Sequence, residues 1–398
     1  MKTDITFSLF LSIRALEAIL RSKTYREMIF NRDVTIFLDA SVEELKDAIG
    51  PIVEESRIGD YLVSKCCSGG FHLANERIAE ILDNPTLFCM YPFSLFILDI
   101  SRADARMIRK RYGVLCYSDQ TSLRLGPLRF QKTSFCEKES PAKSWQSILT
   151  EFSQFPVNTI IINDRYLMQG IPAVVERNIR DIVSSLMPPP DYEGTVNVFF
   201  YFDGVDDRWS KVFVKKHEGK NLDEMNHAFR DAARNEFGKK SRKAYNIVRA
   251  SANGNYAVRT ICSTYHRPLE ENKNNGSISR TTWVEGYDLT HNRRILTDYF
   301  QISADYGLQA FNMEGKAEKE QLITTKGLYC EGLNDSSDLP EERHRVMLSN
   351  FAERMNYKDM FLSVDGNVLD DPGEIKKQLR SIPIFRQHEH RSGTLKVR

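Results

Sequence analysis

Short apolar runs alternate with stretches of helical spacing over the first third of the chain. The runs at 34–39, 87–100 and 113–117 predict buried strands, and the run at 5–13 is either a strand or the apolar start of a helix. A helix start is indicated by Ser41 followed by Glu43 and Glu44, since acidic side chains in a first turn favour the helix dipole. Strands that alternate with helices are typical of α/β units. We therefore expect an N-terminal α/β domain at residues 1–135, built on a small doubly wound sheet.

A second set of elements follows a polar segment at 132–143, which we interpret as a linker. The expected strands are 157–168, 195–203, 245–252, 256–265, 281–289, 293–302 and 307–311, and the expected helices are 171–186, 222–237, 341–356 and 371–379. Gly238 is the natural stop of one helix, and 253–255 is a turn between paired strands. These elements predict a second α/β domain at 145–398, a mixed sheet with flanking helices and a helical C-terminal extension.

Composition limits the classes of function. With 398 residues the chain exceeds the size at which one core keeps growing, which favours two domains. The apolar fraction of 41% and the charged fraction of 27% are ordinary for a folded soluble protein. Because the net charge is +1, nucleic acid would have to bind a local basic patch. The seven scattered cysteines lack zinc-site spacing, and no apolar run reaches the roughly 18 residues of a membrane span, so we expect a reduced, cytoplasmic protein without a membrane partner.

Two short strings carry the candidate chemistry. In the first, His291 and Arg293 share one face of an expected strand, since side chains alternate along a strand. This places an imidazole beside a fixed cation, a combination that suits a phosphate. The second string, with Asn163 and Arg165, is a weaker echo of the first.

The first string resembles the His-x-Lys-x4-Asp motif of the phospholipase D superfamily. His291 and Asp298 match the motif, and Arg293 stands where the family has lysine. Asn163 and Arg165 lie where a first, degenerate copy of the motif would fall. The resemblance implies a phospholipase D-like mixed sheet in which two motifs meet across a pseudo-twofold axis. In active members one histidine attacks phosphorus and the other protonates the leaving oxygen.

A downstream element supports the resemblance loosely. Gly307-Leu308 and Asn312 partly match the Gly-Ser-x-Asn element that follows the motif in that family. The resemblance as a whole covers the region 150–315.

The resemblance assigns a role to each residue. His291 would be nucleophile or acid, since a neutral imidazole can attack or transfer protons near neutral pH. Arg293 and Arg165 would clamp the phosphate together with Asn163, and Asp298 would orient the histidine. Because Asn163 replaces the second histidine, catalysis would need a homodimer that shares its sites, or a different acid.

Several interpretations of these residues are open. The arginines and Asp298 could form an ordinary ion pair, hold an anionic ligand without catalysis, or cleave phosphodiesters as a nuclease. We expect a non-catalytic or weakly catalytic component that binds phosphate or nucleic acid. Decayed nuclease-like domains would fit a role in bacterial antiviral defence, with protein partners as a further option.

A basic cluster offers a second surface for nucleic acid. Its members are Lys211, Lys215, Lys216 and Lys220, and then Lys239, Lys240, Arg242 and Lys243. Tyr201, Phe202 and Trp209 stand upstream, and cations with exposed aromatics suit a phosphate backbone and stacked bases. Interleaved acidic residues make a solvated helical face the alternative.

Acidic residues end three expected strands of the first domain: Asp39, Asp99 and Asp119. Carboxylates at one edge of a parallel sheet suit Mg²⁺, an arrangement used by nucleases of the PIN type, so a metal-dependent nuclease is a further alternative. Asp39 equally suits a helix cap, because it lies just before a helix. No other cofactor is expected.

Overall fold

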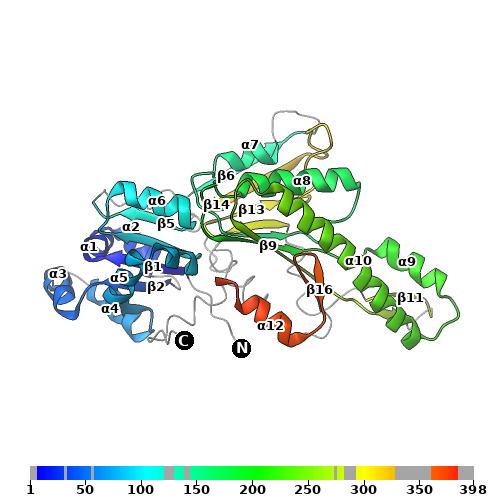
Figure 1. The fold of residues 1–398 in the computed structure, drawn as a ribbon, viewed down its shortest axis with the longest axis horizontal. Helices are drawn as coiled ribbons and strands as arrows, with labels where there is room; N and C mark the ends of the chain where they lie inside the picture. The colour runs from blue at the N-terminus through cyan, green and yellow to red at the C-terminus, as the bar shows by residue number, and fades with distance from the viewer. Residues whose placement is uncertain are drawn as a thin grey trace.

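The computed structural model describes residues 7–30, 34–54, 58–120, 130–138, 144–272, 276–281, 293–327 and 360–383. Two β-sheets lie side by side along the long axis of the molecule, and helices pack against both (Figure 1). The prediction of a mixed α/β protein with two α/β units is confirmed. His291, most of the strand expected at 281–289 and the helix expected at 341–356 lie outside the described residues.

The N-terminal sheet is parallel throughout, with the strand order β3-β2-β1-β4-β5. Its strands are β1 (Phe7–Ser12), β2 (Val34–Asp39), β3 (Phe71–Leu73), β4 (Ser94–Leu98) and β5 (Leu115–Ser118). Its helices are α1 (Ile13–Arg21), α2 (Lys23–Phe30), α3 (Val42–Glu54), α4 (Ile58–Cys67), α5 (Asn75–Asp83), the 3₁₀ helix η1 (Pro85–Met90) and α6 (Arg102–Tyr112). The chain adds strands on both sides of β1, which is the doubly wound arrangement expected from the sequence.

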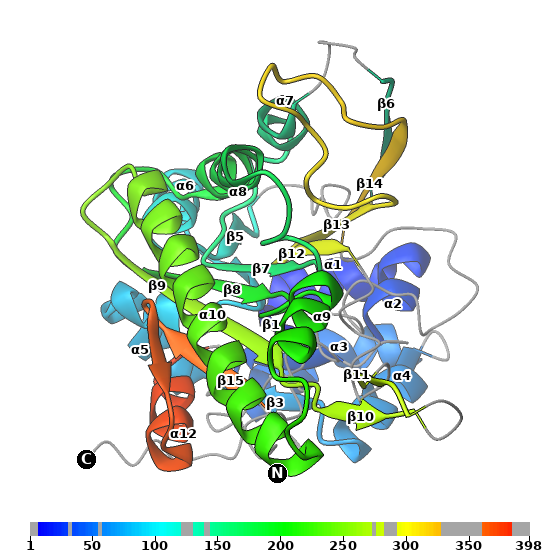
Figure 2. The same cartoon turned by 90° about the vertical axis from the view of Figure 1, so that its right-hand side faces the viewer.

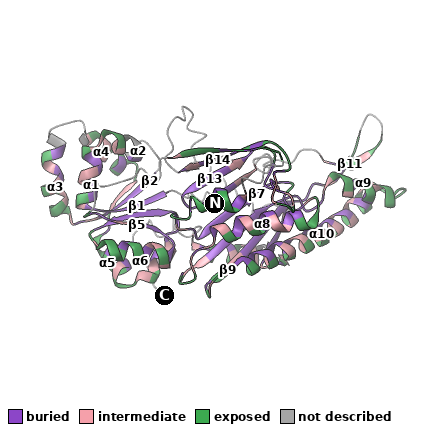
Figure 3. Cartoon of the chain, turned by 90° about the horizontal axis from the view of Figure 1, so that it is seen from above, coloured by how far each residue is buried: buried purple, intermediate pink, exposed green. Residues whose placement is uncertain are grey.

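Strand β1 is buried on both faces. Leu9 and Leu11 face an apolar layer that includes residues of α1, α2 and α3, whereas Phe10 faces a second layer with α5, η1 and α6. Phe10 stacks on Phe37 and Phe96, with ring centroids 4.8 and 4.3 Å apart. The buried strands between outer helices are visible in Figure 3. Burial on both faces explains why this strand is a continuous apolar run in the sequence.

The second sheet is mixed, with the strand order β16-β15-β9-β8-β7-β12-β13-β14-β6. Its strands are β6 (Gln131–Cys136), β7 (Thr159–Asn163), β8 (Thr195–Tyr201), β9 (Ala257–Tyr265), β12 (Arg294–Thr297), β13 (Phe300–Ala304), β14 (Gln321–Gly327), β15 (Met360–Val364) and β16 (Asn367–Leu369). The remaining elements are α7 (Trp145–Thr150), α8 (Pro172–Leu186), α9 (Asp207–Lys216), α10 (Leu222–Ser251), the hairpin strands β10 (Leu269–Glu271) and β11 (Ile278–Arg280), and α12 (Pro372–Arg380). Only β7, β8 and β9 run parallel to one another among these described strands, so their carboxyl ends share one edge.

The boundary between the units differs from the prediction. The segment interpreted as a linker, 132–143, contributes β6, which pairs with β14 at the edge of the second sheet. The C-terminal part, expected as a helical extension, also supplies β15 and β16. The edge strand β6 is mostly polar and exposed, so it has little apolar periodicity in the sequence.

Helix α10 runs through Gly238, so the predicted stop there and the predicted strand at 245–252 are wrong. A Cβ on Gly238 would lie 3.1 Å from Cγ2 of Val368, so the glycine lets the β15–β16 hairpin approach the helix. Figure 2 shows α10 in front, with β15 and α12 beside it. The buried positions continue at helical spacing beyond the glycine, at Ser241, Ala244 and Val248.

Two other predicted strands also differ. The run 293–302 is a hairpin, in which β12 and β13 pair across Asp298 and Tyr299. The run 307–311 is irregular apart from an isolated bridge between Phe311 and Ala317. Among the residues covered by the structure, every helix is too short or too polar to serve as a membrane span.

The two units meet at a buried joint. The hydroxyl of Tyr299 accepts a hydrogen bond from the backbone N–H of Leu115 at 2.8 Å and donates to the carbonyl of Ser94 at 2.8 Å. The side-chain amide of Asn158 donates to the carbonyl of Gly113 at 3.1 Å. The apolar core is continuous across the joint, so the sheets are held in one arrangement.

Candidate nucleic-acid interface

The pairing of β7 with β12 brings together the two arginines singled out in the sequence. The strands are antiparallel, with Asn163 opposite Arg294, so Arg165 after β7 and Arg293 before β12 lie at the same edge. Their guanidinium carbons lie 5.2 and 5.9 Å from the ring centroid of Tyr166. The ring of Tyr166 is therefore an exposed aromatic surface flanked by two cations.

Asp164 holds the loops that carry these groups. Its carboxylate accepts hydrogen bonds from the backbone N–H of Leu308 at 2.8 Å and of Tyr166 at 2.9 Å. Burial raises the pKa of Asp164, while these two N–H donors and the Arg293 cation act in the opposite direction. The sequence interpretation missed this residue, although it stands between two that were identified. Asn163 itself is 1% exposed, so its side chain is not available on this surface as a phosphate ligand.

A buried ion pair with Asp203 holds the side chain of Arg165 in place. Asp203 Oδ2 lies 2.9 Å from Arg165 Nε, 3.1 Å from a terminal nitrogen of Arg267 and 3.4 Å from one of Arg280. All four side chains are buried at the carboxyl edge of β7, β8 and β9. Arg280 also bonds to the carboxylate of Asp207 at 2.5 Å. No local sequence pattern could have indicated this network, because its three arginines lie 38 to 77 residues from Asp203 along the chain.

The basic cluster of α10 divides between two places. Lys240 Nζ lies 3.3 Å from the carbonyl of Asp203, and Lys243 Nζ lies 2.9 Å from the carbonyl of Pro172, so both reach the carboxyl edge. Lys239 pairs with Glu236 at 2.6 Å. Arg242 and Lys239 line a separate groove of about 540 Å³ against the β15–β16 hairpin. Lys240 and Lys243 thus extend the site at Arg165, whereas Lys239 and Arg242 lie at the separate groove.

The aromatic residues expected beside the basic cluster are not a stacking surface. Tyr201 and Phe202 are buried in the core. Trp209 packs against Phe213 and Phe229, with centroids 5.6 and 5.7 Å apart. Tyr201 ends β8 and Phe202 follows it, and because both are buried the expectation that they stack on bases is wrong; Trp209 lies in α9 and packs within that layer.

A second exposed tyrosine, Tyr306, lies in the loop that follows β13. Tyr306 is 61% exposed, and Lys319 Nζ lies 5.7 Å from its ring centroid. Together with Gly307 and Gln309 these residues line a groove of about 250 Å³, to which Glu318 contributes a carboxylate. The amide of Gln309 donates to the carbonyl of Tyr166 at 2.9 Å, which joins the two tyrosine surfaces.

Asp298 lies at the opposite end of β12 from Arg293. It is fully buried, and its Oδ2 accepts hydrogen bonds from the backbone N–H groups of Asn158 at 2.8 Å and Thr159 at 3.0 Å. These residues begin β7, whereas the arginines lie at its end. Asp298 therefore does not lie beside Arg293, since four residues of extended strand separate the two positions. His291, the residue that Asp298 was expected to orient, lies outside the described residues.

The carboxylates of the N-terminal sheet do not form the expected magnesium site. Burial, and the carboxylates of Glu44 and Asp99, raise the pKa of Asp39. Asp119 instead accepts a hydrogen bond from the Ser12 hydroxyl at 2.6 Å. Within the described ranges, no group of three or more histidine, cysteine or acidic side chains is arranged to hold a metal ion.

Asp39 is not a helix cap either. The Ser41 hydroxyl accepts from the backbone N–H of Glu44 at 3.2 Å, and the Glu44 carboxylate accepts from that of Ser41 at 2.8 Å. This reciprocal pair begins α3 and confirms the helix start read from the sequence.

No protein-family model matches the chain, and no curated protein sequence matches it.

Proposed function

We propose that the chain binds single-stranded nucleic acid along the carboxyl edge of β7, β8 and β9. The observation that carries this proposal is the pair of exposed tyrosines, Tyr166 and Tyr306, each with a cation over its ring. Bases stack on aromatic rings whatever their sequence, and adjacent cations hold the phosphates, so this combination suits single strands.

Lysines of α10 extend the same surface. Lys240 and Lys243 reach the edge beside Arg165 and Pro172, so the cations continue from the tyrosines toward the helix. Arg293 carries a guanidinium group, which stays protonated and grips phosphate bidentately, whereas Arg165 is buried in its ion pair with Asp203 and contributes positive charge beneath the surface. These groups support binding rather than proton transfer, in agreement with the phosphate-binding role expected from the sequence.

The test is fluorescence anisotropy with labelled oligonucleotides of about 12 nucleotides, a length within the range of one single-strand site. Single-stranded DNA, single-stranded RNA and the matching DNA duplex are titrated at low and moderate salt. We expect single strands to bind more tightly than the duplex, and Tyr166→Ala and Arg293→Ala each to weaken binding about tenfold, since one base–aromatic stack contributes roughly 1–3 kcal/mol. Tyr166→Phe should retain most of the affinity.

Lys46→Ala is the matched control, because this exposed lysine of α3 belongs to the N-terminal unit and lies outside both the groove and the tyrosine surfaces. Equal affinity in Tyr166→Ala, Arg293→Ala and the control would refute the proposal. Denaturing gels of the same mixtures test the enzymatic alternative. Cleavage in EDTA that disappears in His291→Ala would identify the chain as a phosphodiesterase that uses His291.

A further inference from the structure

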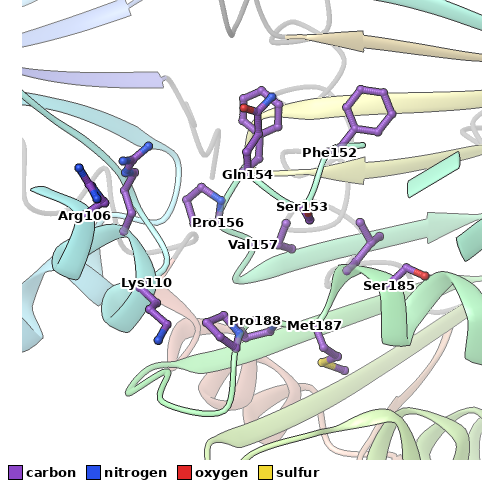
Figure 4. A pocket seen from close by; sticks show the side chains of 14 residues that line it. Arg106, Lys110, Phe152, Ser153, Gln154, Pro156, Val157, Ser185, Met187 and Pro188 are labelled. Carbon is purple, nitrogen blue, oxygen red and sulfur yellow. The ribbon is translucent and has the colours of Figure 1, made fainter. Parts of the chain in front are cut away.

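A cavity of about 380 Å³ lies between the two α/β units. One wall is α6 of the N-terminal unit, and the other consists of the segment 152–157 and the end of α8 with the prolines that follow it. Figure 4 shows Arg106 and Lys110 on one side and Pro156, Val157 and Pro188 on the other. Its volume lies within the range of small-molecule sites.

The wall from α6 is cationic. Arg106, Arg109 and Lys110 share one face of the helix, because residues three and four apart are neighbours on a helix surface. Lys110 pairs with Asp191 at 2.8 Å, and the guanidinium carbon of Arg109 lies 5.2 Å from the ring centroid of Tyr117. Arg106 makes no ion pair with any residue in the described part of the chain. It is therefore the cation best placed to accept a ligand's charge.

The facing wall is apolar with a few polar groups. Phe152 and Val157 supply buried apolar surface, and Pro156 with Pro188 stiffens the loops that hold it. Gln154 adds a side-chain amide, which can both donate and accept hydrogen bonds. The lining contains no carboxylate. One side of the cavity thus suits an anion, and the other suits a flat, partly apolar group with polar edges.

We propose that this cavity binds a nucleoside phosphate, with the phosphate against Arg106 and Lys110 and the base against the segment 152–157. Inorganic phosphate would leave the apolar wall unused, and a neutral apolar molecule would leave the cations unused. The site is separate from the tyrosine surfaces and does not rest on the function proposed for them. Because its walls come from both units, the bound nucleotide would also hold the units together.

The test is isothermal titration calorimetry on the full chain, with AMP, UMP and orthophosphate as probes. We expect AMP to bind more tightly than orthophosphate, and Arg106→Ala to weaken AMP binding at least tenfold, as expected for loss of a charge-assisted hydrogen bond. Arg102→Ala is the matched control, because Arg102 is exposed on the same helix but does not line the cavity. Ser153→Trp, at an exposed lining position, should block the cavity and abolish binding.

Three outcomes would overturn the proposal. The first is no binding of AMP or UMP, and the second is equal binding by Arg106→Ala and Arg102→Ala. The third is orthophosphate binding as tight as AMP binding, which would mean that the site takes an anion alone. Tyr166→Ala should leave AMP binding unchanged, so failure here is distinguishable from failure at the oligonucleotide surface.

Discussion

Asp298 is a buried carboxyl group, and its burial disfavours the ionised form. It lies at the joint between the units, next to Tyr299 along the chain and hydrogen bonded to the start of β7. Burial raises the pKa of Asp298 to about 7, because desolvation outweighs the hydrogen bonds from Asn158 and Thr159. The folded protein therefore binds a proton at this position more tightly than the unfolded chain does.

This residue predicts how stability depends on pH. A raised folded pKa stabilises the protein below the unfolded value near 3.8, and this contribution is lost as pH rises through about 7. We expect Asp298→Asn, which keeps an acceptor for both N–H groups, to flatten the fall in unfolding free energy between pH 5 and pH 8. The measurement is urea unfolding of both proteins at these two pH values. Parallel pH profiles would contradict the assignment.

At the scale of elements, the loop after β13 carries the second tyrosine and depends on one glycine. Gly307 has φ +123°, which side chains rarely adopt, and its Cβ would lie 3.2 Å from Asp164 Oδ2. Leu308, the next residue, donates to the same carboxylate. The loop is therefore held against β7 at a place where only glycine fits.

Gly307→Ala should lower the free energy of unfolding by about 1–3 kcal/mol through backbone strain and the close approach to Asp164. It should also weaken oligonucleotide binding, because Tyr306 and Arg293 adjoin this position. Gly219→Ala is the matched control, since Gly219 has φ +91° but nothing within 4 Å of its Cβ. Equal effects of the two substitutions on binding would show that the loop does not position the tyrosine surface.

At the scale of the whole molecule, the hydroxyl of Tyr299 is one of the buried groups that join the two units. Tyr299 extends from the β12–β13 hairpin into the N-terminal unit, where it bonds to the backbone of β4 and β5. Burial raises the pKa of Tyr299 well above its usual value, so the hydroxyl stays neutral and able to donate. The arrangement of the units depends on this contact and on the continuous core around it.

Removing the Tyr299 hydroxyl should weaken the contact between the two units and lower the stability of the protein. In Tyr299→Phe the buried N–H of Leu115 loses its partner, and a buried unsatisfied group costs about 1–3 kcal/mol. We expect the urea midpoint to fall, whereas Tyr306→Phe, at an exposed position, should leave it unchanged. Nucleotide binding in the cavity between the units should weaken in parallel. An unchanged midpoint in Tyr299→Phe would mean that apolar packing alone holds the joint.

Elements whose pattern is local could be predicted from the sequence. The buried runs of β1, β2 and β8, the start of α3 at Ser41 and the doubly wound first sheet could all be predicted, because side-chain periodicity and capping act over a few residues. The apolar spacing that continues beyond Gly238 is the local signal for the full length of α10.

The way in which the candidate residues come together depends on long-range strand pairing. Arg165 and Arg293 meet because β7 and β12 pair, and Asp298 is removed from them by the same antiparallel register. Asp203 gathers arginines from three distant segments, and β6 joins a sheet whose other strands lie far along the chain. Such contacts form between segments that are distant in the sequence, and no local pattern indicates which segments will pair. They stabilise the protein only once these segments have been brought together by folding.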